Sequence, residues 1–252
     1  MLSELLGLPT HPLTTFLGLV VGGVTLYGTL STLSYFYFFR WRKERYHPTY
    51  VEDPTTIKRA LKWSAVSLLG NALLMTPFHL AIAYGWSRVY YDVDDYGWAW
   101  LLVSIGCYLV VTETLIYWVH RALHWGPLYK YIHEPHHSFK QPISFVGVAF
   151  NPLDSFAQGL AHHLCAFLFP VHVAVYLVFV TFVTVWAVMI HDRVSFVRWK
   201  GINYTGHHTL HHWYANYNFG QFFTAWDRLG GTYKDPESEE VLAEVPAGVL
   251  RR

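Results

Sequence analysis

Long apolar runs separated by short polar segments dominate this chain. They cover residues 15–39, 61–86, 98–119 and 160–190. Each run is long enough to cross a bilayer as a helix, which takes about 20 residues. The pattern therefore predicts an all-α, multispanning membrane protein with about four transmembrane helices, formed by a single domain over residues 1–252.

The last apolar run is too long for one ordinary crossing and is interrupted at Phe169 and Pro170. Two interpretations are open, because a proline can either kink a membrane helix or mark a turn. One is a single long kinked span, and the other is a tight hairpin that turns at Pro170. We favour the hairpin, since it returns the chain to the side of the membrane on which residues 120–159 lie.

The placement of charge predicts the orientation of the spans. The first run ends in the basic sequence RWRKER, and the second opens with Lys58, Arg59 and Lys62. Positively charged loops stay on the cytoplasmic side, so this loop is expected there. The same topology predicts a cytoplasmic, histidine-rich metal-binding cap formed by catalytic segments at residues 120–159 and 191–233.

Composition agrees with a membrane protein and excludes other classes. Hydrophobic residues make up 53% of the chain and charged residues only 14%, which is too apolar for an ordinary soluble domain. The formal net charge of +1 and the lack of a sustained basic stripe give no indication of nucleic acid binding. Cys107 and Cys165 fall inside apolar runs, where a thiol behaves as a small hydrophobic group.

One face of the third span carries polar residues. Helical spacing places Glu113, Tyr117, His120 and His124 within about 60° of one another. A histidine pair at i and i+4 can bind one metal ion. Glu113 lies deeper in the span, where an ionisable group is costly. It is expected either to accept a hydrogen bond from a ligand imidazole or to be a neutral carboxyl paired with a neighbouring helix.

Two further histidine clusters follow, with the same HxxHH spacing. The first is HEPHH, in which Pro135 predicts a helix start near Glu134. The second lies in GHHTLHH, where the HxxHH histidines would share one face of a helix. His207 widens that face. It could bind a second metal ion, contact a ligand imidazole or face the lipid headgroups.

Metal binding explains these clusters better than structural histidines do. Eight crowded imidazoles would disfavour each other's protonation and leave buried nitrogens without partners, whereas metal ions use neutral imidazoles as ligands. Eight nitrogens suit two metal ions with open positions. Imidazole binds zinc, copper, iron and nickel alike, so the ligand type does not identify the metal.

The order HRALH, HEPHH and HHTLHH resembles the fatty acid hydroxylase and sterol desaturase superfamily. The match extends to the segments LYKYIHEPHHSFKQPISF, NPLDSF, AVMIHD and YNFGQFFTAWDRLGGTYKDP, which look like the sterol C5-desaturase branch. The resemblance covers roughly residues 112–236. It departs at Asn151, where the family's FHP-like segment leads us to expect a histidine.

The resemblance implies an O2-dependent, non-haem di-iron oxidoreductase that would introduce the C5(6) double bond into a Δ7-sterol in sterol biosynthesis. Zinc can replace the two iron ions in purified protein. Electrons would come from an external donor such as cytochrome b5 with its NADH-dependent reductase, or a bacterial equivalent. The substrate would enter from the bilayer, and the membrane would be that of the endoplasmic reticulum or the bacterial inner membrane.

The resemblance also assigns site residues. The expected metal ligands are His120, His124, His133, His136, His137, His191, His208, His211 and His212. His163 and His207 resemble recurring family positions and either bind metal or are structural. Glu113, Tyr117 and Asp192 are expected to support the ligand histidines without binding metal themselves.

Three alternative functions remain at this stage. A hydroxylase of the same superfamily could act on a 4-methyl sterol, fatty acid, carotenoid or other lipid. A membrane haem electron carrier would place histidine pairs on facing spans instead of HxxHH clusters near the surface. A metal transporter would need polar residues through the membrane centre, where these spans have few.

Overall fold

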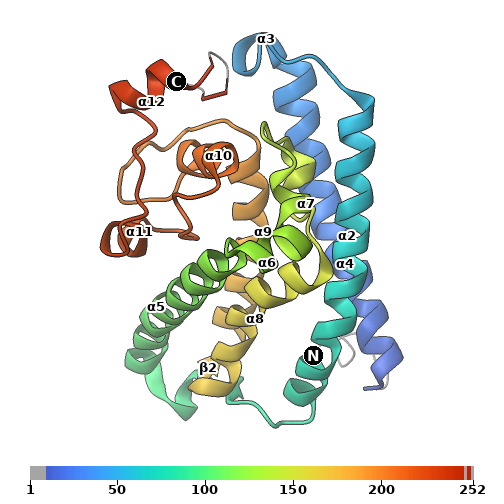
Figure 1. The fold of residues 1–252 in the computed structure, drawn as a ribbon. Helices are drawn as coiled ribbons and strands as arrows, with labels where there is room; N and C mark the ends of the chain where they lie inside the picture. The colour runs from blue at the N-terminus through green and yellow to red at the C-terminus, as the bar shows by residue number, and fades with distance from the viewer. Residues whose placement is uncertain (1–9, 247–248, 251–252) are drawn as a thin grey trace.

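The computed structural model describes residues 10–246 and 249–250, and it is built almost wholly of helices (Figure 1). Four helices are long and apolar enough to cross a membrane: Pro12–Trp41, Pro54–Ala83, Gly97–Leu123 and Val173–His191. Their outward faces expose large aliphatic side chains such as Val21, Leu73 and Val178, as lipid contact requires. The expected all-α membrane fold with about four spans is confirmed.

Local signals set the ends of the first two spans. The first comprises α2 (Pro12–Tyr35) and the π-helical η1 (Phe36–Trp41), and the short α3 (Lys43–Tyr46) follows it. The second, α4 (Pro54–Ala83), begins where the Asp53 side chain accepts a hydrogen bond from the backbone N–H of Thr55. Both spans start several residues before the apolar runs at 15–39 and 61–86, because caps and first turns are polar.

The third span, α5 (Gly97–Leu123), extends one turn beyond the predicted end at residue 119. A two-stranded parallel sheet joins the far ends of the bundle, with β1 (Val89–Tyr90) paired to β2 (Val171–His172). The 3₁₀ turn η2 (Val93–Asp95) lies between β1 and α5. The extra turn of α5 keeps His120 helical and makes His124 the C-cap.

The apolar run at 160–190 divides into two helices. α8 (Pro152–Leu168) begins at Pro152, with Asn151 as its cap, and α9 (Val173–His191) follows the break at Phe169 and Pro170. The run is therefore a hairpin and not one kinked span, and α9 alone is a candidate membrane span. Asn151, where a histidine was expected, caps α8 by accepting a hydrogen bond from the Leu153 N–H.

The remaining elements form a cap at one end of the bundle. They are α6 (Gly126–Leu128), η3 (Tyr129–His133), α7 (Glu134–His137), η4 (Ser144–Val146), α10 (Thr205–Tyr214), α11 (Ala225–Leu229) and α12 (Glu239–Glu244). α7 begins at Glu134, where a helix start was expected, and it directly continues the helical turns of α6 and η3. Figure 1 places α7 and α10 toward the same end of the bundle as the basic α3.

The packing of the helices explains this arrangement. α4 packs between α2 and α8, α8 also packs against α5, and α10 packs against the end of α9. These contacts bring the C-terminal ends of α5 and α9 together beneath α10. The histidines of the two HxxHH clusters and of the third span therefore meet at one place.

Candidate metal centre

The structure sorts nine of the predicted ligand histidines into two groups. Within each group, one nitrogen per imidazole lies within 4.8 Å of the others. Group 1 contains His120, His124, His133, His137 and His211, and group 2 contains His136, His191, His208 and His212. Two adjacent groups of nitrogen ligands can hold two metal ions.

Helical spacing distributes the two HxxHH clusters over both groups. His133 and His137 are four residues apart and face group 1, whereas His136 faces group 2. On α10, His211 turns to group 1, and His208 and His212 turn to group 2. Each cluster thus contributes to both groups, and the groups lie beside each other with the rings of His137 and His212 only 4.9 Å apart.

The nitrogens of group 2 converge on one another. The Nε2 atom of His191 lies 2.9 Å from that of His208, 3.2 Å from that of His212 and 3.4 Å from that of His136. Ligand nitrogens about 2.1 Å from one metal ion lie roughly 3.0–3.4 Å apart. One N–H cannot serve three neighbouring nitrogens, so this geometry fits a shared cation and not a hydrogen-bonded cluster.

The nitrogens of group 1 also lie close to one another or lack hydrogen-bonding partners in the described part of the chain. The Nε2 atoms of His133 and His137 are 3.1 Å apart. The Nε2 atoms of His124 and His211 are buried and have no hydrogen-bonding partner among the residues that the structure describes. A metal ion is the partner that would satisfy all of these nitrogens together.

Backbone carbonyls fix the tautomers of three histidines. The Nδ1 atoms of His120, His191 and His211 lie 2.9, 2.6 and 2.8 Å from the carbonyl oxygens of Phe219, Ala187 and Tyr217. A carbonyl oxygen only accepts, so each Nδ1 carries the proton. Each Nε2 therefore presents its lone pair to the centre, which is the arrangement that metal ligation requires.

A carboxylate orients a fourth histidine. The Nδ1 atom of His133 lies 2.6 Å from Oδ2 of Asp154, and Gln158 donates to the other carboxylate oxygen at 2.7 Å. All three side chains belong to the junction of η3 and α8. Asp154 was not predicted from the sequence as a site residue, although its place one turn after the Asn151-Pro152 helix start was a usable signal.

The Asp154 contact gives a first testable prediction. Replacing Asp154 with Asn keeps the shape of the side chain but removes the negative charge that strengthens the His133 ligand. We expect metal affinity to fall about 10–100-fold, as is typical when the partner of a metal-bound imidazole is lost. Competition with a metal chelator would measure the change. Asp95→Asn, in the exposed loop at the far end, is the matched control, and equal affinity in both variants would contradict the role.

Burial keeps the cap histidines neutral. Desolvation, followed by the repulsion of neighbouring imidazoles, holds the pKa values of His136, His137, His208, His211 and His212 well below the usual range. The pKa of His124 is lowered for the same reasons. Neutral imidazoles are the form that binds metal, so no proton has to leave these side chains near pH 7.

The partner of Glu113 is neither of the two expected ones, a ligand imidazole or a neighbouring helix. Its two carboxylate oxygens accept hydrogen bonds from the backbone N–H groups of Phe222 and Phe223, at 2.8 and 3.1 Å. These amides belong to the segment at 219–223, which we call the clamp segment. Its first residue, Phe219, supplies the carbonyl that orients His120. Glu113 therefore acts on the site through the backbone of this segment.

Asp227 holds the same segment from the other side. Its carboxylate accepts from the N–H groups of Phe219 and Gly220, each at 2.8 Å, and from the hydroxyl of Thr232 at 2.7 Å. Burial raises the pKa of this carboxyl, and the hydrogen bonds oppose the rise. A side chain at Gly220 would collide with the backbone of Phe223, so the turn leaves no room for a Cβ. Asp227 was not predicted from the sequence as a site residue.

Tyr117 and Asp192 make hydrogen bonds to residues other than the ligand histidines. The Tyr117 hydroxyl lies 3.0 Å from that of Thr232 and accepts from Arg121 at 2.9 Å. The Asp192 carboxylate accepts from the Val194 N–H at 2.9 Å. No contact with a ligand imidazole is among these, so both residues brace the chain around the site.

Two further histidines, His163 and His207, lie outside both groups. His207 is buried against Tyr204, with Nε2 3.4 Å from the Tyr233 hydroxyl, and burial lowers its pKa to about 3. Its complete burial is at odds with the expected contact with lipid headgroups, and it belongs to neither histidine group. The Nδ1 atom of His163 lies 2.5 Å from the Tyr176 hydroxyl. Neither side chain is part of a group that could hold a metal ion among the described residues.

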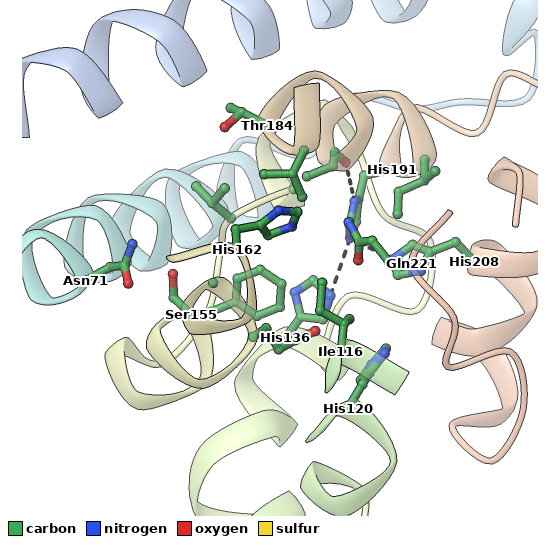
Figure 2. Close-up of a pocket in the computed structure, with 18 of the residues that line it drawn as sticks. Asn71, Ile116, His120, His136, Ser155, His162, Thr184, His191, His208 and Gln221 are labelled. Carbon is green, nitrogen blue, oxygen red and sulfur yellow. Dashed lines mark hydrogen bonds between the residues drawn. The ribbon is translucent and has the colours of Figure 1, made fainter. Parts of the chain in front are cut away.

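A cavity of about 180 Å³ opens beside the two groups (Figure 2). One part of its wall is formed by histidines of both groups: His120 of group 1, and His136, His191 and His208 of group 2. Apolar side chains such as Ile116, Val183 and Ile190 line another part. A lipid group bound in this cavity would lie directly against the histidine centre.

Comparisons with known proteins agree with this site. The family model described as fatty acid hydroxylase matches residues 105–232, which include every histidine of the two groups. Lathosterol oxidase of Mus musculus is 39% identical over 87% of this chain and 74% of its own length, and that of Homo sapiens is equally similar. Delta(7)-sterol 5(6)-desaturase of Candida albicans is 37% identical over 93% of this chain and 61% of its own length. No solved structure matches the chain significantly.

Proposed function

Since the chain belongs to the fatty acid hydroxylase family, we propose that it is a membrane oxidoreductase that desaturates a sterol. The reaction is the introduction of the C5(6) double bond into a Δ7-sterol. The relatives named for this reaction cover most of the chain at 37–39% identity. The observation that carries the proposal is the cavity whose wall includes histidines of both groups.

The metal ions of the proposed enzyme would be two iron ions, one held by each histidine group. Imidazole nitrogens suit iron, and the neutral state of the cap histidines leaves their lone pairs available. When bound, the iron ions would supply the activation of O2 and the removal of hydrogen from an unactivated C–H bond. The nine histidines of groups 1 and 2 would be the ligands.

The protein's own residues prepare the site for this reaction. Carbonyls and Asp154 fix the direction of four imidazoles, so little reorganisation accompanies metal binding. The apolar wall formed by Ile116, Val183 and Ile190 excludes bulk water and packs against the hydrocarbon skeleton of the substrate. The lipid reaches the cavity from the bilayer in which the four spans lie.

The proposed reaction needs electrons from outside the chain. Removing two hydrogens from the sterol and reducing O2 to two water molecules consumes two further electrons and two protons. We propose an external donor such as cytochrome b5 with its reductase, or a bacterial equivalent. The histidine end would face the cytoplasm, since the basic loop around α3 lies at the same end and basic loops remain cytoplasmic (Figure 1).

Sterol analysis tests this function directly. Expression in a host that lacks sterol C5-desaturase should restore 5,7-diene sterols, which are recognised by mass spectrometry and by the absorbance of the conjugated diene. His136→Ala should restore none. An oxygenated sterol without a conjugated diene would identify a hydroxylase instead, and unchanged sterols despite folded, iron-loaded protein would reject the substrate.

A further inference from the structure

His162 is a buried histidine that belongs to neither metal group. It lies on α8, is only 2% exposed and lines the cavity beside the histidine centre. Neither of its ring nitrogens has a hydrogen-bonding partner among the residues that the structure describes. Its backbone carbonyl accepts from the Tyr108 hydroxyl at 3.0 Å, which ties this turn of α8 to α5.

A second polar side chain on the cavity wall also has a buried atom without a hydrogen-bonding partner in the part of the chain that the structure describes. Asn71 comes from α4, and its Oδ1 atom is buried without a partner among the described residues. Ser155 and Gln158 of α8 also line the cavity. Figure 2 shows Asn71, Ser155 and His162 around the same cavity as His136 and His191. The cavity therefore combines a polar wall from α4 and α8 with the histidine centre.

Unpartnered buried groups of this kind destabilise a protein that has no use for them. Each buried donor or acceptor left unsatisfied bears the cost of losing its hydration. A water molecule in the cavity can serve such groups in the free protein, and an arriving hydroxyl group can replace it. Both His162 and Asn71 offer hydrogen-bonding atoms to whatever occupies the cavity.

We propose that the polar wall around His162 and Asn71 binds the hydroxyl group of the sterol, directly or through a bridging water molecule, and thereby holds its hydroxyl-bearing ring against the histidine centre. This inference rests on the proposed function and adds the residues that position the substrate. Imidazole and carboxamide can each donate or accept, which matches a hydroxyl group, the one polar group of a simple sterol. A cationic headgroup would find no carboxylate among the described residues that line the cavity.

The dimensions of the cavity agree with this orientation. A cavity of about 150 Å³ holds benzene, so the volume of about 180 Å³ accommodates a ring end and not a whole sterol. In a Δ7-sterol, the carbon that carries the hydroxyl group and C5 belong to the same six-membered ring. Holding the hydroxyl at His162 therefore keeps the C5–C6 bond close to the histidines.

The test compares a Δ7-sterol with its 3-deoxy analogue on the purified, iron-loaded protein in detergent. Displacement of a radiolabelled Δ7-sterol gives the dissociation constants, and diene absorbance gives kcat/KM when O2 and an electron donor, reduced cytochrome b5 with its reductase, are supplied. The natural protein should prefer the hydroxylated sterol by about 10-fold or more, because a site built for a hydroxyl rejects analogues that lack it. His162→Phe and Asn71→Leu should each reduce this preference to about threefold or less.

Matched variants separate substrate recognition from folding and metal binding. His162→Gln keeps a donor and an acceptor and should retain part of the preference. His79→Phe removes another histidine, whose ring packs against His163, and should leave the preference unchanged. His162→Phe should keep both iron ions and melt at the same or a higher temperature, since it removes unsatisfied groups.

The possible results distinguish the proposed role of His162 and Asn71 from the proposed desaturase function. Diene formation with equal preference for both sterols overturns the role of His162 and Asn71 but leaves the desaturase function intact. Preferential binding of the hydroxylated sterol without diene formation supports the role and rejects the function. Loss of iron from His162→Phe would make His162 a metal ligand and overturn the inference, and failure to bind either sterol would overturn both proposals.

Discussion

His191→Ala should remove one of the two bound metal ions and almost abolish sterol desaturation. The Nε2 atom of His191 lies within 3.4 Å of the Nε2 atoms of His136, His208 and His212, so its loss opens the middle of group 2. We expect a larger effect than the roughly 10–100-fold that the loss of an orienting partner costs. Elemental analysis of the purified variant, together with diene absorbance, would measure both effects.

His172→Ala is the matched control for this prediction. His172 lies at the far end of the bundle, where its side chain caps α9 by accepting a hydrogen bond from the Ala174 N–H at 3.2 Å. Removing the cap should cost roughly 1 kcal/mol of stability and leave the metal content unchanged. Two metal ions and full activity in His191→Ala would show that this histidine is not a ligand.

Glu113→Ala should destabilise the protein by about 2–4 kcal/mol and reduce the rate of desaturation. The carboxylate accepts from two backbone amides of the clamp segment, and its removal leaves both amides without a partner inside the protein. The clamp segment also supplies the carbonyl that orients His120. Thermal unfolding in detergent would measure stability, and iron titration would show weaker binding as His120 loses its fixed direction.

Two glutamate variants refine this prediction. Glu113→Gln retains one acceptor but turns an N–H2 group toward the second amide. The stability of this variant should therefore lie between that of the natural protein and that of Glu113→Ala. Glu240 is an exposed glutamate that pairs with Lys234, and Glu240→Ala should change stability by less than about 1 kcal/mol. If Glu113→Ala melted like Glu240→Ala, the carboxylate would not hold the clamp segment.

The fold was largely predictable because its signals are local. Apolar length predicts the spans, and the break at Pro170 predicts the hairpin. The ends of helices were predicted less well, since Asp53 and Asn151 cap helices that begin before the apolar runs. Asn151 followed by Pro152 is an ordinary helix-start signal, so the beginning of α8 could have been found from the sequence.

The partners of the site residues could not be predicted in the same way. Helical spacing correctly placed Glu113 on the face of His120, yet it could not identify the amides of Phe222 and Phe223 as its partners. These amides lie more than 100 residues further along the chain. The position of His162 on the cavity wall could not be predicted from the sequence either, because it depends on the packing of α8 against α4 and α5.

By itself, the sequence determined the membrane helices and most of the candidate histidine ligands, since apolar length and histidine spacing are properties of neighbouring residues. His191 was added to these candidates by the family resemblance. Only the tertiary structure divided these histidines into two groups, with His133 and His137 in one and His136 in the other. It also decided which nitrogen of each ring faces the centre. The reason is physical: ring direction depends on contacts between distant segments, such as that of His120 with the carbonyl of Phe219, 99 residues away.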